Sequence, residues 1–210
     1  RKNIRPGDVV AIYAHRDPTL ALAILAVLKA GAVFVIFDPA YPTPRLIDYV
    51  RIARPKGWLR MAGAGALPRQ LSDFFQRTEI RCLVDLPCAK KEIAHLVERQ
   101  SAGAREINLT ADDPAYIAFT SGSTGEPKGV LCRHGPITHF LPWQQEAFGL
   151  RSSDRYALLS GLGYNHLQRD LFTALASGAS LFIPTNEQLQ NPEQLNDWLR
   201  RCKISILHLT

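Results

Sequence analysis

The chain has 210 residues, of which 46% are hydrophobic and 21% are charged. This composition is ordinary for a soluble globular protein, and the length suffices for one domain or one large subdomain with its own core. The net charge of +6 favours anionic ligands in general. The basic residues are scattered, however, so we predict no nucleic-acid binding. The longest apolar run, residues 20–28, is too short to span a membrane.

Short apolar runs alternate with helical patterns along the chain. In chain order the patterns predict a strand at 9–13, a helix at 18–30, a strand at 32–37, a helix at 44–54, a strand at 57–61, a helix at 67–75, a strand at 81–85, a helix at 89–100, a strand at 115–120, a helix at 137–148, a strand at 156–160, a helix at 167–177, a strand at 181–183, a helix at 192–201 and a strand at 205–209. Strands that alternate with helices predict an α/β fold with mostly parallel sheets flanked by helices.

The helix ends carry recognisable signals. Asp17 is a preferred cap in front of Pro18, and Gly31 is a common terminator of the helix that follows. Asn191 caps the last helix in the same way. Both ends of the sequence lie inside segments that look structured, so we expect residues 1–210 to be part of a larger domain.

The four cysteines predict neither disulfides nor a metal centre. Cys82, Cys88, Cys132 and Cys202 form no CxxC pair, and no histidine lies at zinc-finger spacing. Several lie in apolar runs, which is typical of buried, reduced thiols in an intracellular protein. We therefore expect a cytoplasmic protein whose own side chains bind no metal.

The segment at residues 116–130 carries the strongest chemical signal. An apolar strand runs into the sequence TSGSTGEPKG, which combines hydroxyl groups, glycines and a lysine. Exposed N–H groups and hydroxyls donate well to phosphate oxygens, and Lys128 adds a mobile positive charge. Gly122, Gly125 and Gly129 are expected to give the loop backbone conformations with φ > 0.

The segment is not a Walker A loop, because no Gly-Lys-Ser/Thr follows Gly122 at the required spacing. The alternative reading is a flexible surface linker. Linkers are not usually preceded by a five-residue apolar strand and closed by Pro-Lys-Gly, so phosphate binding is the preferred interpretation.

Three segments resemble motifs of the adenylate-forming superfamily. Residues 120–129 are similar to the phosphate loop shared by acyl-CoA synthetases, luciferases and the adenylation domains of nonribosomal peptide synthetases. Residues 28–42, LKAGAVFVIFDPAYP, resemble an early motif of the peptide-synthetase branch that builds scaffold. Residues 159–172 fall where the family has its acid-binding motif, and they look closest to the adenylation domains of α-aminoadipate reductases. The resemblance extends over residues 4–210.

The resemblance implies that residues 1–210 form part of the large N-terminal subdomain of an adenylation domain, without the C-terminal subdomain and the later motifs. It implies a two-step reaction that uses ATP and Mg²⁺. A carboxylate attacks the α-phosphate of ATP and releases pyrophosphate, and the acyl group then passes to the phosphopantetheine thiol of a carrier protein, in cis or in trans. No catalytic acid or base is expected, because a carboxylate nucleophile is already ionised at pH 7.

The resemblance also implies two sets of site residues. The residues expected to hold the β- and γ-phosphates are Thr120, Ser121, Gly122, Ser123, Thr124, Gly125 and Lys128. The residues expected to line the acid pocket are Tyr164, Asn165, His166 and Arg169.

Asn165 is the most informative of these residues. It matches the position where members that activate amino acids carry an aspartate that pairs with the α-ammonium group of the substrate. Asparagine is neutral and offers a cation only its carbonyl oxygen. We therefore predict a substrate other than an ordinary α-amino acid, and Arg169 is suited to an acidic or polar tail. Arg169 has the alternative of pairing with Asp170.

Three other functions remain open at this point. The first is an acyl-CoA or fatty-acyl ligase of the same superfamily, and the second is a structural adenylation-like domain that no longer turns over. The third is a non-enzymatic nucleotide- or RNA-binding module. The sequence at 38–42 favours the carrier-protein branch, and the loop glycines with Lys128 favour an active enzyme.

Overall fold

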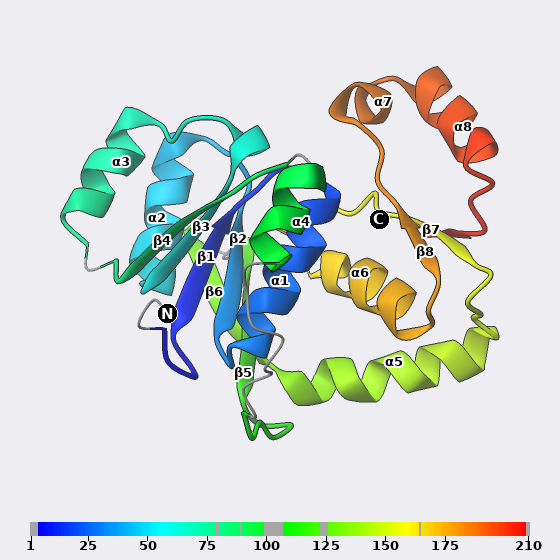
Figure 1. The fold of residues 1–210 in the computed structure, drawn as a ribbon, viewed down its shortest axis with the longest axis horizontal. Coiled ribbons are helices and arrows are strands. Elements are labelled where there is room, and N and C mark those ends of the chain that lie inside the picture. Colours follow the sequence, from blue (N-terminus) through cyan, green and yellow to red (C-terminus); the bar gives the residue numbers. More distant parts are fainter. Residues whose placement is uncertain are drawn as a thin grey trace. The chain divides into compact units, whose positions relative to one another are not determined.

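The structure is a computed structural model that describes residues 4–78, 80–88, 90–98, 107–121, 126–163 and 165–208. The chain forms two compact units, Arg1–Arg133 and His134–Thr210, and each unit has its own sheet (Figure 1). Among the described helices, none combines the length and the apolar character needed to cross a membrane.

The first unit is built on a six-stranded sheet in the order β4-β3-β1-β2-β5-β6. Its strands are β1 (Val9–Tyr13), β2 (Val33–Phe37), β3 (Gly57–Met61), β4 (Cys82–Leu86), β5 (Pro114–Ser121) and β6 (Pro127–Arg133). The first five are mutually parallel, and β6 pairs antiparallel with β5. The prediction of an α/β fold with mostly parallel sheets is confirmed.

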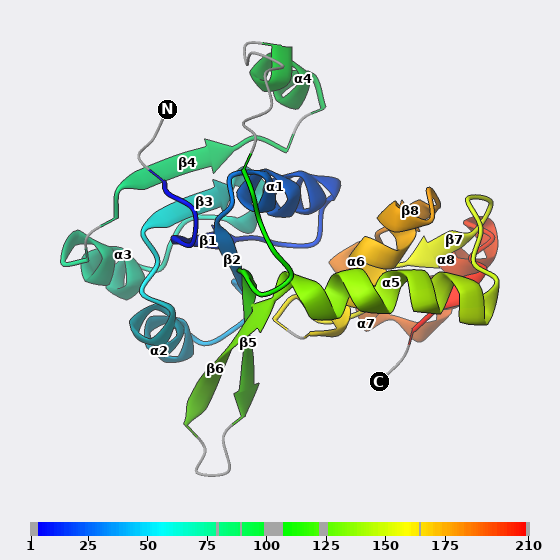
Figure 2. The same cartoon turned by 90° about the horizontal axis from the view of Figure 1, so that it is seen from below.

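The helices of this unit are α1 (Pro18–Lys29), α2 (Thr43–Ala53), α3 (Arg69–Gln76) and α4 (Lys90–Glu98), with a short 3-10 turn, η1, at Ala62–Ala64. Figure 2 shows α1 on one face of the sheet and α2 and α3 on the other. All five residues of β2 are buried, because helices cover both faces of the central strands.

The predicted ends of the first helix are confirmed. The side chain of Asp17 accepts a hydrogen bond of 2.8 Å from the backbone N–H of Thr19 at the start of α1. The helix ends at Lys29, and Gly31 takes a left-handed conformation with φ of 69°. This turn aligns β2 beside β1, with Val33 opposite Val9.

The second unit has a three-stranded parallel sheet in the order β8-β7-β9. Its elements are α5 (His134–Phe148), β7 (Arg155–Ala157), α6 (His166–Ala176), β8 (Ser180–Phe182), α7 (Asn186–Gln190), α8 (Pro192–Arg201) and β9 (Ile206–Leu207). The α6 helix connects two neighbouring parallel strands, which is the usual βαβ arrangement.

Strand β6, helix α7 and the short η1 turn were not predicted from the sequence, and β7 ends at Ala157, whereas the sequence predicted a strand to residue 160. Residues 127–133 form strand β6, whereas the sequence predicted no strand there, because Pro127 and Gly129 are both poor strand formers. Pairing with β5 along the whole hairpin overrides that local preference. Helix α7 was also not predicted, and it is stabilised by a capping box between Thr185 and Gln188.

We expect Gly31→Ala to lower the free energy of unfolding by about 2 kcal/mol. A left-handed conformation costs a residue with a Cβ about 1–2 kcal/mol. In addition, the new Cβ would lie 3.0 Å from Cγ2 of Ile107 and 3.3 Å from Cβ of Pro6. Urea denaturation of the purified protein measures the change.

Gly149→Ala is the matched control, because Gly149 has a similar φ of 62° and a Cβ there would meet nothing within 4 Å. In this variant only the unfavourable left-handed backbone conformation should lower the free energy of unfolding. The loss should therefore be smaller than in Gly31→Ala. Equal losses in the two variants would show that contacts with Ile107 and Pro6 do not constrain the turn.

Candidate functional site

The β5–β6 hairpin positions two of the predicted phosphate-binding residues (Figure 2). Its register pairs Thr120 with Lys128. Directly opposed residues of an antiparallel pair carry their side chains on the same face, with Cβ atoms about 4.5–5.5 Å apart. Both residues are exposed. The hairpin therefore presents a hydroxyl and an ammonium group side by side at the base of the predicted loop.

Of the other predicted phosphate-binding residues, Ser121 alone belongs to a described strand. It ends β5, where its backbone pairs with Pro127. The predicted ligands Gly122, Ser123, Thr124 and Gly125 lie outside the described residues, as does Tyr164 of the predicted acid pocket. Their roles stay predictions.

The sequence predicted a backbone conformation with φ > 0 for Gly129. In the structure this glycine is instead explained by close packing. It lies within β6, and it is not among the described glycines with positive φ. A Cβ at this position would come within 2.8 Å of Cγ2 of Ile52 in α2. The missing side chain lets α2 approach the hairpin, where the rings of Tyr49 and Phe119 stack 3.6 Å apart.

The end of the hairpin that is remote from the glycine-rich loop is anchored in the core. Tyr116 of β5 is buried and stacks on Phe34 of β2, with ring centroids 5.5 Å apart. Burial raises the pKa of the Tyr116 hydroxyl, and interaction with Cys132 on the facing strand raises it further. The tyrosine therefore stays neutral, and the base of the hairpin is fixed in the core.

The second unit contains a cavity of about 570 Å³ with apolar walls and a cationic end. Phe140, Trp143 and Phe148 of α5 contribute aromatic rings, and the polar lining includes Arg169 and His208. Trp143 and Phe148 are more than half exposed, so the apolar side is open to solvent. A cavity of this size and lining suits a small organic ligand.

Asp170 organises the cationic end of this cavity. Its side chain is fully buried. The carboxylate accepts a hydrogen bond from the hydroxyl of Ser160 and lies 2.7 Å from Nδ1 of His208. Helix α6 thus supplies the buried side chain that holds the imidazole of His208 at the cavity.

Arg169 lies beside this cluster with unused hydrogen-bonding capacity. Its Nε is 3.5 Å from Oδ1 of Asp170, which is the alternative pairing expected from the sequence. The same Nε is buried and has no hydrogen-bond partner among the described groups. A guanidinium group that lines a cavity and is incompletely paired favours an anionic or carbonyl ligand there.

The other predicted pocket residues are placed differently. Asn165 and His166 start helix α6 and are exposed, and neither is among the described residues that line the cavity. His208 lines the cavity but was not predicted. Its one sequence signal is a polar residue within the apolar run at 204–209, and a core histidine gives the same pattern.

The scaffold role predicted for residues 28–42 agrees with the structure. Asp38 follows β2 and accepts a hydrogen bond from the backbone N–H of Ala40, which makes the turn into α2. At the start of α2 the guanidinium of Arg45 lies 5.1 Å from the ring centroid of Tyr41 and 5.5 Å from that of Tyr49. These contacts stabilise the turn by cation–π interaction.

Comparison with known proteins decides the family. The AMP-binding enzyme family model matches residues 1–210. The chain belongs to the AMP-binding enzyme family. It is 35% identical over its whole length to the L-2-aminoadipate reductase of Schizosaccharomyces pombe and 30% identical to the dimodular nonribosomal peptide synthase of Bacillus subtilis. It spans 16% of the first relative and 8% of the second.

The fold is also similar to that of a solved structure. The N-terminal subdomain of Klebsiella oxytoca NpsA, in complex with 3-hydroxybenzoyl-AMSN, is similar with a TM-score of 0.75 and 26% identity. The match covers 98% of this chain and 48% of that one. The predicted membership of the adenylate-forming superfamily is therefore confirmed, and this chain has relatives in both the peptide-synthetase and the aminoadipate-reductase branches.

Proposed function

We propose that the protein containing this chain activates a carboxylic acid with ATP and transfers the acyl group to the phosphopantetheine thiol of a carrier protein. The observation that supports this most is the hairpin, which sets Thr120 opposite Lys128 at the base of the glycine-rich loop in an AMP-binding chain. The similarity to a nonribosomal peptide synthase supports the carrier protein as partner. We also propose that residues 1–210 belong to the N-terminal subdomain.

In the first step, a carboxylate oxygen of the acid forms a bond to the α-phosphorus of ATP, and the bond to the leaving pyrophosphate oxygen breaks. Thr120 and Lys128, with the loop between them, hold the β- and γ-phosphates and offset the charge that builds up on the leaving group. These phosphates would hold a Mg²⁺ ion, which would supply further charge neutralisation when bound. The exposed hydroxyl and ammonium groups of the hairpin fit such a polyphosphate.

In the second step, the thiol sulfur of the carrier bonds to the acyl carbon, and AMP leaves. An acyl-CoA ligase would use free coenzyme A in the same step. The carrier is favoured by the similarity to peptide synthetases, and a direct competition between carrier protein and coenzyme A distinguishes the two acceptors.

The cavity in the second unit supports an acid with an anionic or polar tail. Its walls are apolar, and its polar lining includes the guanidinium of Arg169 and the imidazole of His208. The aminoadipate in the names of the relatives has a second carboxylate and also an α-amino group, so it supports the acidic tail and not the choice of α-substituent. We propose that Asn165, which is exposed at the start of α6 and outside the described cavity lining, faces the α-carbon of the acid. Its amide carries no charge to pair with an α-ammonium, so a neutral or absent α-substituent is preferred.

A panel of matched acids tests this substrate class. α-Amino, α-hydroxy, α-keto and unsubstituted dicarboxylic acids of one chain length are compared by pyrophosphate release, together with the monocarboxylic acid of the same length. We expect the α-hydroxy, α-keto or unsubstituted dicarboxylic acid to have the highest kcat/KM, and Arg169→Ala to abolish the preference for the distal carboxylate. A tenfold advantage for the α-amino acid, about 1.4 kcal/mol, would contradict the role of Asn165.

A further inference from the structure

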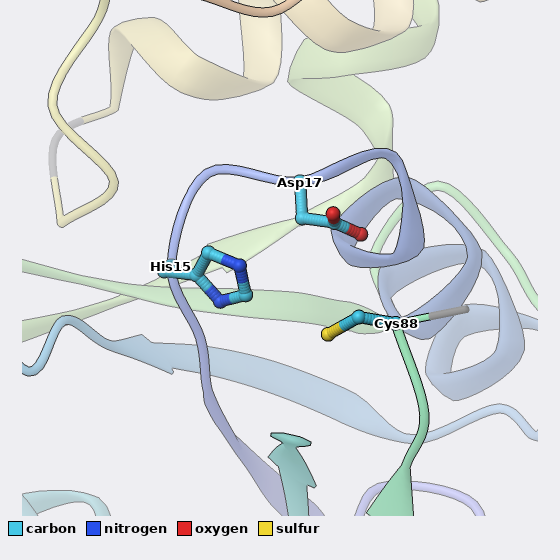
Figure 3. A group of neighbouring side chains, drawn as sticks. All are labelled: His15, Asp17 and Cys88. Atoms are coloured by element: carbon cyan, nitrogen blue, oxygen red, sulfur yellow. The ribbon is translucent and has the colours of Figure 1, made fainter. Parts of the chain in front are cut away.

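The carboxyl ends of β1 and β4, which flank β3 in the sheet, bring together three side chains that the proposed reaction does not use. His15 and Asp17 lie on the connection from β1 to α1, and Cys88 follows β4. In the sheet order β4-β3-β1 the strands run parallel, so these connections emerge at one edge. Figure 3 shows the thiol of Cys88 pointing toward the imidazole of His15, and the carboxylate of Asp17 directed toward the start of α1.

The three groups have the spacing of a metal site. One nitrogen of His15, one carboxylate oxygen of Asp17 and Sγ of Cys88 all lie within 4.8 Å of one another. Zinc bonds to nitrogen and oxygen at about 2.0–2.2 Å and to sulfur at about 2.3 Å, which for tetrahedral angles separates the ligand atoms by about 3.3–3.8 Å. Small rotations of these half-buried side chains would shorten the distances between the ligand atoms from within 4.8 Å to the values of a tetrahedral site.

Each of the three groups is held in a state suited to coordination. Asp17 uses Oδ1 for the backbone N–H of Thr19, which fixes the carboxylate and leaves its other oxygen for a ligand. Cys88 Sγ accepts a hydrogen bond of 3.1 Å from the backbone N–H of Gly63, which fixes the position of the sulfur. Nδ1 of His15 is buried and has no hydrogen-bond partner among the described groups.

Gly63, in the η1 turn after β3, makes room for this cluster. A Cβ at Gly63 would come within 2.3 Å of Cε1 of His15 and 3.1 Å of Sγ of Cys88. Its φ is not among the described positive values, so the glycine is explained by the space that His15 and Cys88 occupy and not by backbone conformation. Three adjacent strand ends therefore contribute to one site.

We propose that His15, Asp17 and Cys88 bind a divalent transition-metal ion of the zinc class, with water as the fourth ligand. Imidazole, carboxylate and thiolate together match the ligand preferences of Zn²⁺, whereas a thiolate is a poor ligand for Mg²⁺. On binding, the thiol proton of Cys88 passes to solvent and the sulfur–metal bond forms. The two negative ligands offset the partial positive charge at the start of α1.

The test is metal binding by the purified, chelator-treated protein. We expect one equivalent of Zn²⁺ per chain to survive gel filtration, and Co²⁺ to produce thiolate-to-metal charge-transfer absorption in the near ultraviolet. Cys88→Ser and His15→Ala should each weaken Zn²⁺ binding at least tenfold and remove or shift the Co²⁺ band. Cys202→Ser is the matched control, and it should bind as the parent does.

Gly63→Ala keeps all three ligands and tests the geometry if Cys88→Ser does not fold. It should weaken Zn²⁺ binding, because the added methyl group displaces the His15 ring. The proposal is overturned if the parent protein retains no equivalent of Zn²⁺, if Co²⁺ gives no thiolate band, or if binding is the same in Cys88→Ser, His15→Ala and Gly63→Ala as in Cys202→Ser.

Discussion

Replacing Asp170 by alanine is expected to lower the free energy of unfolding by about 3 kcal/mol, the largest stability effect that we predict for a single side chain. The carboxylate is fully buried and is shared between the hydroxyl of Ser160, Nδ1 of His208 and the guanidinium of Arg169. Removing it leaves two basic groups and a hydroxyl without their common partner in a poorly solvated place.

Asp170→Asn tests the contribution of the charge, because asparagine has nearly the same volume as aspartate and can still accept a hydrogen bond from the hydroxyl of Ser160. We expect an intermediate loss of stability for this variant. Asp197→Ala is the control from the same unit, since Asp197 is exposed in α8, and it should change stability by no more than about 0.5 kcal/mol. Urea denaturation of the three variants measures these differences. A loss below about 0.5 kcal/mol for Asp170→Ala would show that the cluster does not stabilise the second unit.

Local patterns in the sequence were sufficient for the elements and for much of the first sheet. The apolar runs at β1 and β2, the cap at Asp17 and the terminator at Gly31 are short-range signals, and the structure places each as expected. Strand β6 escaped prediction because its partner strand, and not its own residues, makes it a strand.

The candidate sites were less accessible to sequence reasoning, because they depend on contacts between distant segments. His208 meets Asp170 only when β9 is placed beside β7 and α6, and no local pattern records that pairing. His15 and Cys88 likewise meet only through the strand order, so the expectation of no metal ligands rested on spacing alone. The phosphate loop was recognisable because all its residues are contiguous.

Replacing Lys128 by alanine is expected to lower kcat/KM for ATP about 10²- to 10³-fold, the effect typical of removing one preorganised group that stabilises developing charge. Lys128 is exposed near the end of the hairpin, opposite Thr120, so its loss should change stability by no more than about 0.5 kcal/mol. We therefore expect this substitution to lower the activity while the stability of the fold is nearly unchanged.

Arg133→Ala provides a matched control. Arg133 lies on the same strand, carries the same charge and ends β6 away from the loop, where it pairs with Asp112 at 2.8 Å. An exposed pair of this kind contributes little to stability. This variant should keep nearly full activity, and an equal loss in both variants would attribute the effect of Lys128 to net charge and not to its place beside the loop.

The most direct measurement of the proposed function is the exchange of labelled pyrophosphate into ATP by the intact protein, with and without the preferred acid. Formation of an acyl-adenylate predicts exchange that requires the acid, falls about 10²-fold or more in Lys128→Ala and persists in Arg133→Ala. Exchange that is absent with every acid of the panel, or that is equally fast in Lys128→Ala, would contradict activation of a carboxylic acid at this site.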